Sequence, residues 1–354
     1  MIVFFAGLMC TFCCIWMLKK PAVLIGLLDQ PGGRKSHEGA VPLIGGIAMF
    51  CGFVLSALLL QLPSFKSFIP FISGMVIMIV VGALDDYRDL SAKPKFFAQI
   101  SAAALMVLWG GNAIANLGNL VGNGEIILGG IALPFTIFCV VGLVNALNLS
   151  DGLDGLAGGL ALVASLALTV VATLLGSGMA VWLLLLSSVI AGFLVFNLRH
   201  PLRKRASVFM GDAGSMMLGY ALVWFAVHLT QRAGPHMPPV TAVWIFALPL
   251  MDTVAIMIRR ISKGRNPFEG DREHLHHILL LAGYSHAQTV FILLALAVLM
   301  GGIGVGFWMA GVPDFMAFFL FLGLFALYFM AMRNAWKTMK VLHHWHDDHS
   351  HAKD

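Results

Sequence analysis

The sequence predicts an all-α integral membrane protein, a polytopic bundle of about eleven transmembrane helices. One observation behind this prediction is composition: 59% of the 354 residues are hydrophobic and only 11% are charged. A water-soluble domain of this length cannot bury so much apolar surface. The other observation is the spacing of polar residues, which separate apolar stretches long enough to cross a bilayer.

The apolar stretches set the order of the expected elements. A transmembrane helix needs about 17–25 mainly apolar residues. Such stretches centre near residues 10, 52, 76, 104, 136, 166, 189, 222, 248, 298 and 323. The first lacks the preceding basic residues of a cleaved signal peptide, so we expect a retained span. We expect one catalytic membrane domain over residues 1–342 and a disordered histidine-rich tail over 343–354.

The basic residues indicate the orientation of these spans. If the N-terminus lies outside, all but two of the 22 lysines and arginines fall on the inner side, the exceptions being Lys66 and Arg232. Lysine and arginine are enriched in cytoplasmic loops. We therefore expect an outside N-terminus and a cytoplasmic C-terminus. Only the acids Glu125 and Asp314 fall outside, so the polar chemistry is expected at the cytoplasmic face.

A polar stretch between the fifth and sixth expected spans has the sequence NALNLSDGLDGL. It places Asn145, Asn148, Asp151 and Asp154 at three-residue intervals. Ionisable groups at membrane depth are costly and indicate function, and Gly152 lets the backbone turn or approach a ligand closely. The alternative is a polar turn that only joins two helices.

The third expected span ends in the sequence DDYRD, with Asp85, Asp86 and Asp89. Positions i, i+3 and i+4 share a helix face, so we expect the three carboxylates to lie together. They would repel one another without a bound cation, a basic partner or a raised pKa. A Mg²⁺-assisted site or a general base fits this pattern, and a solvated helix end is the alternative.

The eighth expected span begins at VFMGDAGS. Exposed N–H groups at a helix start favour phosphate, and Asp212 can hold a metal ion that bridges phosphate oxygens. Phe209 could stack on a base, or it could anchor the chain at the membrane interface.

Two inner loops add basic and histidine side chains that suit an anion such as a diphosphate. The loop DREHLHH lacks the HExxH pattern, which disfavours a metalloprotease. The first inner loop could contact either a phosphate or lipid headgroups. The candidate residues are Arg272, His274, His276 and His277 in the former loop and Arg34, Lys35 and His37 in the latter.

Taken in order, these motifs resemble those of a known family. LLDQPGGRKSHEGAVPLIGG, DDYRD, NALNLSDGLDGL, VFMGDAGS, PLMDTVAIMIRR and DREHLHHILL run through nearly the whole chain. The sequence resembles the polyprenyl-phosphate N-acetylhexosamine-1-phosphate transferases of glycosyltransferase family 4, and most closely the type that acts on GlcNAc. The related phospho-MurNAc-pentapeptide transferases have three consecutive histidines where this chain has HLHH. That enzyme type and other UDP-HexNAc donors remain alternatives.

The resemblance implies an enzyme that transfers GlcNAc-1-phosphate from UDP-GlcNAc to undecaprenyl phosphate and releases UMP. It implies Mg²⁺ or Mn²⁺ as cofactor and a role in starting a lipid-linked polysaccharide of the O-antigen or enterobacterial common antigen type. It also implies the inner membrane of a bacterium as the location, with the active site facing the cytoplasm. The expected partners are the two substrates and membrane lipid, with no nucleic acid, and the sequence leaves open whether a homo-oligomer forms.

The resemblance also implies roles for the candidate residues. Asp85, Asp86, Asp151 and Asp154 are the expected catalytic acids, and Asp212 with Asn148 is the expected metal site. The uridine pocket would be formed by Asn145, Asp151, Gly152, Asp154 and Phe209. Arg272, His274, His276 and His277 would hold the diphosphate and sugar, and Asp85, Arg34, Lys35 and His37 the lipid phosphate.

The reaction is physically consistent with this placement. A soluble nucleotide sugar and a lipid-anchored phosphate can meet only at the membrane interface, and both are anions that repel each other. Our mechanistic hypothesis is a single displacement with Asp85 as base or orienting group; an aspartyl-phosphate intermediate is the rival. A transporter or flippase predicts ionisable groups in mid-span, where only Asp252 is a candidate. A non-catalytic scaffold gives no reason for converging acids and histidines.

Overall fold

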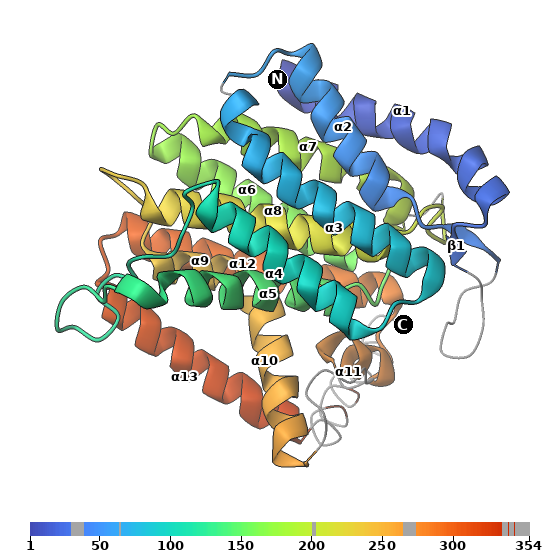
Figure 1. The fold of residues 1–354 in the computed structure, drawn as a ribbon. Helices are drawn as coiled ribbons and strands as arrows, with labels where there is room; N and C mark the ends of the chain where they lie inside the picture. The colour runs from blue at the N-terminus through green and yellow to red at the C-terminus, as the bar shows by residue number, and fades with distance from the viewer. Residues whose placement is uncertain are drawn as a thin grey trace.

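The computed structural model describes residues 1–29, 39–63, 65–199, 203–264 and 274–334, together with residues 339 and 343. Nearly all of this part of the chain is helical (Figure 1). The helices are α1 (Ile2–Ile25), α2 (Gly45–Leu59), α3 (Ile69–Arg88), α4 (Ala92–Leu108), α5 (Ala132–Leu149), α6 (Leu156–Leu174), α7 (Met179–Asn197), α8 (Gly211–Gln231), α9 (Pro239–Ile245), α10 (Ala247–Ser262), α11 (Leu275–Leu281), α12 (His286–Met309) and α13 (Asp314–Arg333). The prediction of an all-α, polytopic bundle is confirmed.

Each expected span centre falls on a helix, but the helices differ in their ability to cross a membrane. Within the described residues, eight are long and apolar enough, and a ninth span results if the bent pair α9 and α10 counts as one. The other two expected spans are α2, with 15 residues, and α4, with 17. These lengths are at or below the lower limit for a bilayer. The count of eleven and the orientation therefore stay predictions.

The ninth expected span, centred near residue 248, is broken into two helices. The chain bends by 81° between α9 and α10, and Figure 1 shows α10 leaving the bundle steeply. Pro249 lies in the first turn of α10. Because proline has no N–H, it cannot continue a hydrogen-bond ladder from α9, and the chain breaks at Phe246.

The helix α8 is the central element of the bundle (Figure 1). Of the residues in its 18-residue apolar stretch, 94% are buried, a larger share than in any other described helix that could span a membrane. It packs against α2, α3, α5 and α6. Small residues permit the closest of these contacts. A Cβ atom on Gly46 of α2 would lie 2.3 Å from the Gly214 nitrogen, and one on Gly82 of α3 would lie 2.4 Å from the Ala213 Cα.

A short stretch of backbone pairing fixes the chain just before α8. The strands β1 (Leu28–Asp29) and β2 (Val41–Pro42) pair antiparallel. The Phe209 N–H donates to the Pro42 carbonyl at 2.9 Å, and the Phe209 carbonyl accepts from the Gly45 N–H at 2.9 Å. The first inner loop and the start of α8 are therefore neighbours, although about 170 residues of sequence separate them.

The contact between α3 and α8 gives a prediction about stability. Gly82→Ala should destabilise the protein by about 1–3 kcal/mol, because the new methyl group meets the backbone of Ala213 and Asp212, which cannot rotate away. Thermal unfolding of the detergent-solubilised protein measures the effect. Gly142→Ala in α5 is the matched control, since a Cβ there has no neighbour within 4 Å, and it should change stability by less than about 1 kcal/mol. Equal effects of the two substitutions would contradict this packing.

Candidate active site

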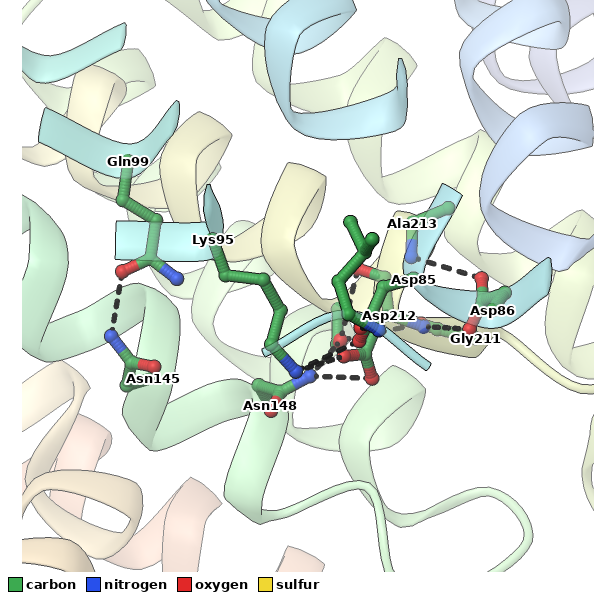
Figure 2. A network of polar contacts seen from close by, with 11 residues as sticks. Asp85, Asp86, Lys95, Gln99, Asn145, Asn148, Gly211, Asp212 and Ala213 are labelled. Carbon is green, nitrogen blue, oxygen red and sulfur yellow. Dashed lines mark hydrogen bonds and ion pairs between the residues drawn. The ribbon is translucent and has the colours of Figure 1, made fainter. Parts of the chain in front are cut away.

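Asp86 joins the end of α3 to the start of α8. Its carboxylate accepts hydrogen bonds from the backbone N–H groups of Asp212, at 2.8 Å, and Ala213, at 3.2 Å (Figure 2). The first N–H groups of a helix have no partner inside the helix, so a carboxylate placed there satisfies them and also interacts well with the helix dipole. Gly211, at φ +70°, leaves the room that this carboxylate fills: a Cβ atom would lie 2.3 Å from Asp86 Oδ2. Asp86 thus has a clear structural function.

Lys95 lies between two carboxylates that come from different helices. Its Nζ atom is 2.8 Å from Asp85 Oδ2 on α3 and 3.3 Å from Asp212 Oδ2 on α8 (Figure 2). The other Asp85 oxygen accepts from the Leu90 N–H at 2.7 Å. Two carboxylates this close would repel each other, and the ammonium group offsets that repulsion. From the sequence, Lys95 was expected only among the inner-loop cations, and no local pattern indicated this position.

Asp85, Asp86 and Asp212 form a carboxylate cluster. Its third carboxylate, Asp212, comes from α8 and not from the DDYRD turn. The prediction that Asp89 shares a helix face with Asp85 and Asp86 is wrong. The helix α3 ends at Arg88, and Asp89 follows in a left-handed conformation with φ +52°, so the helical spacing does not continue. Asp89 is exposed, and Asp212 completes the cluster in its place.

The two asparagines of NALNLSDGLDGL have different surroundings on α5. Asn148 donates to Asp212 Oδ1 at 3.0 Å and to Ser215 Oγ at 2.9 Å, so it belongs to the carboxylate cluster. Asn145 instead donates to Gln99 of α4 at 2.7 Å (Figure 2). Gln99 and Lys95 are four residues apart on the face of α4 that meets α5, and neither was selected from the sequence.

The carboxylate cluster has the donor chemistry that Mg²⁺ or Mn²⁺ requires, which is oxygen from carboxylates and amides. Asp85 and Asp212 offer these oxygens, and Asn148 would add one if its amide group turned over. Within the described residues, no group of three or more acidic, histidine or cysteine side chains has a metal-binding arrangement. The reason is visible in the geometry: the Lys95 ammonium lies between two of the acids, and Asp86 faces the start of α8.

Asp151 and Asp154 lie in the turn between α5 and α6, where they have different partners. Asp154 accepts from Arg199 Nε at 2.6 Å and from the Ala206 N–H at 3.2 Å, so it ties this turn to the segment that follows α7. Asp151 is exposed, and neighbouring protein atoms remove part of the water around its carboxyl group. This partial desolvation and the negative charges of Asp212, Asp86 and Asp154 raise the pKa of Asp151 to about 7.

The histidines of HLHH lie against the same turn. His276 is 3% exposed, and its Nε2 atom would lie 2.4 Å from a Cβ on Gly152, so glycine is needed for this approach. Within the described part of the chain, this Nε2 atom has no hydrogen-bond partner. Burial, with His277 and His274 nearby, lowers the pKa of His276 to about 3. His276 is therefore neutral at pH 7.

The structure brings together part of the predicted site. Asp85, Asp86, Asn148 and Asp212 form one network, and Gly152 contacts His276. The Asp151 carboxyl group lies within electrostatic reach of Asp86 and Asp212. Phe209 is half-buried beside the first inner loop, and its stacking on uracil stays a prediction. The expected site residues Arg34, Lys35, His37 and Arg272 lie outside the described residues, as does the histidine-rich tail apart from His343.

This geometry defines a class of protein: a membrane helix bundle that carries carboxylates, an ammonium group and histidines at its helix ends. Residues 68–230 match the model of glycosyl transferase family 4. The chain belongs to this family, which confirms the family predicted from the ordered motifs.

Relatives align along nearly the whole chain. The chain is 36% identical to an undecaprenyl-phosphate alpha-N-acetylglucosaminyl 1-phosphate transferase of Yersinia pestis, over 93% of this chain and 90% of the relative. Proteins of the same name from Escherichia coli K12 and Haemophilus influenzae are each 35% identical. The Haemophilus protein aligns over 96% of both chains.

The Asp86 contact predicts how two substitutions differ. Asp86→Ala should lower the stability of the purified protein by about 0.5–2 kcal/mol, because two N–H groups at the start of α8 lose their acceptor. Asp86→Asn should retain most of the stability, since asparagine caps helices about as well as aspartate. Thermal unfolding without substrates measures both. Equal losses in the two variants would contradict the capping function.

The lowered pKa of His276 predicts a pH dependence of stability. The ordinary histidine pKa is 6.5 and the folded-state value is about 3, so the unfolded chain binds a proton that the folded chain excludes. This contribution is complete above pH 6.5 and is lost as the pH falls toward 3. Between pH 7.5 and 5.0 it should decrease by about 2 kcal/mol. His276→Gln should remove this part of the decrease in thermal stability, and an unchanged pH profile would refute the assignment.

Proposed function

We propose that this protein transfers GlcNAc-1-phosphate from UDP-GlcNAc to undecaprenyl phosphate, releasing UMP and forming undecaprenyl-diphospho-GlcNAc. The observation that carries the proposal is the ammonium group of Lys95 between Asp85 and Asp212. Family membership and relatives named for this reaction support the same conclusion.

The substrates explain why such a cluster belongs at helix ends. The donor carries a diphosphate and dissolves in water, whereas the acceptor carries one phosphate on a lipid. Their reacting groups meet where the bilayer ends, and we place this site at the cytoplasmic face of the inner membrane because the basic residues concentrate there in sequence. The orientation proposed here agrees with the source of the donor, a soluble nucleotide sugar.

A divalent cation, Mg²⁺ or Mn²⁺, would be held by Asp212 and Asp85, with Asn148 as a further ligand. When bound, it would neutralise charge on the diphosphate and on the departing UMP. Lys95, released from the two carboxylates, would then be free to contact a phosphate oxygen. Catalysis of phosphoryl transfer consists largely of such positioning and charge stabilisation.

We propose a single displacement for the chemical step. An oxygen of the acceptor phosphate forms a bond to the β-phosphorus of UDP-GlcNAc, and the bond from that phosphorus to the bridging oxygen breaks, so UMP leaves with the oxygen. Asp85 orients the attacking phosphate or accepts its proton. Uridine would be held by Asp151, by the turn between α5 and α6 that contains it, and by Phe209. His276 would donate or accept hydrogen bonds at the diphosphate and sugar.

Activity with purified components tests the proposal. With UDP-GlcNAc, undecaprenyl phosphate and Mg²⁺, we expect UMP and a lipid-linked GlcNAc product in equal amounts, and no UMP without the lipid acceptor. UDP-GalNAc and UDP-MurNAc-pentapeptide, supplied separately, should be poor donors. Absence of product would refute the function. A labelled phospho-enzyme formed without acceptor would refute the single displacement.

The metal assignment predicts a selective loss of turnover. Asp212→Asn should lower kcat by about 10²–10³-fold or more, because a neutral amide would hold the proposed cation less well and the charge stabilisation that this cation would supply is lost. Chelation by EDTA should abolish turnover until Mg²⁺ is restored. Glu125→Gln is the matched control, since this exposed acid pairs with Asn116 in the loop predicted outside, and it should leave kcat unchanged. Near-wild-type turnover by Asp212→Asn would contradict the assignment.

A further inference from the structure

Asp252 is a buried acid that the proposed reaction does not use. It lies on α10 and is only 8% exposed. A carboxylate that is so buried requires hydrogen-bond donors around it. From sequence, it was the only acid expected within a span, which made it a candidate for a transport pathway. The structure gives it a different environment.

Three donors from two segments, α13 and the start of α11, satisfy this carboxylate. Tyr328 of α13 donates its hydroxyl to Oδ1 at 2.6 Å, and the Leu275 N–H donates to the same oxygen at 3.1 Å. The His274 Nδ1 atom lies 2.7 Å from Oδ2. Because a carboxylate only accepts hydrogen bonds, this Nδ1 must carry the proton. The ring is therefore fixed in one tautomer and one orientation.

The contacts continue from His274 to the turn between α5 and α6. The His274 ring stacks on His276 with centroids 5.6 Å apart and an interplanar angle of 14°. The His276 ring reaches the Gly152 backbone, beside Asp151. The helix α11 has only seven residues, so its own backbone hydrogen bonds stabilise it poorly, and contacts with other segments must hold it in place. Asp252 supplies two of the contacts that hold its first turn.

We propose that Asp252 is a positioning residue for the transferase reaction: through His274 it holds the α11 histidines against the Asp151–Gly152 turn, and Tyr328 of α13 supports it. This inference rests on the proposed function for its effect on turnover, but not for its effect on the position of α11. A carboxylate that accepts a hydrogen bond from a histidine fixes the orientation of the ring. For metal-binding histidines, loss of this carboxylate typically lowers affinity or activity about 10–100-fold.

The test compares Asp252→Asn with the wild type and with Glu125→Gln, the same chemical change at a remote acid. An asparagine offers one acceptor oxygen and places an NH₂ group against a donor, so His274 is no longer fixed. We expect the KM for UDP-GlcNAc to rise about tenfold or more, while the KM for undecaprenyl phosphate stays within about twofold. A mere loss of folded protein would lower kcat and leave both KM values unchanged, and that result would overturn the proposal.

A double-mutant cycle tests whether Asp252 acts through His274. On a His274→Gln background, Asp252→Asn should lower kcat/KM for UDP-GlcNAc by no more than about twofold. Losses that multiply would overturn the proposal. Tyr328→Phe retains the Asp252 and His274 pair and removes one donor; we expect its KM for UDP-GlcNAc to rise about 2–10-fold. This variant decides the question if Asp252→Asn does not fold, and an unchanged KM would count against the proposal.

Hydrogen exchange separates this inference from the proposed function. In Asp252→Asn, amides of residues 274–281 should exchange at least about tenfold faster than in the wild type, and in Glu125→Gln they should not change. If the wild type transfers no sugar phosphate, the proposed function fails while the exchange rates still test the positioning. Unchanged protection of these amides would overturn the positioning, whatever the activity.

Discussion

The fold depends on how Asp85 and Asp212 are kept together. They belong to helices that are distant in sequence, and their contacts with Lys95 are partly buried, so water screens these charges less well than in solution. The Lys95 ammonium balances both at 2.8 and 3.3 Å, while Asp86 holds the start of α8 against α3. This arrangement has the oxygen donors for a divalent cation, so the proposed cation would bind at the contacts that also join α3 to α8.

The glycines explain how a polar cluster forms at the end of an apolar bundle. Gly46 and Gly82 let α2 and α3 approach the backbone of α8 so closely that no larger residue fits. Backbones at this distance bring the acids of α3 within reach of the first turn of α8. Gly152 does the same for His276. Each of these glycines lies within or beside a motif that was predicted to carry the chemistry, and the proposed reaction requires side chains from separate helices at short distances.

Much of the fold could be predicted from the sequence, because the apolar stretches that form the helices are local features. All the expected span centres fall on helices, and the motifs that indicated the family contain the acids that meet. What could not be predicted depends on contacts between distant segments. Lys95 resembled an ordinary inner-loop cation, and nothing local indicated that it reaches Asp212. The break at Phe246 did have a local signal in Pro249, whereas the turn at Asp89 had none.

A titration with Mn²⁺, followed by electron paramagnetic resonance on the purified protein without substrates, tests most directly whether Lys95 occupies the position of the cation. If its ammonium competes for Asp85 and Asp212, Lys95→Met should bind Mn²⁺ about tenfold or more tightly than the wild type, because the competing charge is gone. Equal or weaker binding by Lys95→Met would contradict the account, since the two carboxylates would then not be the cation's ligands.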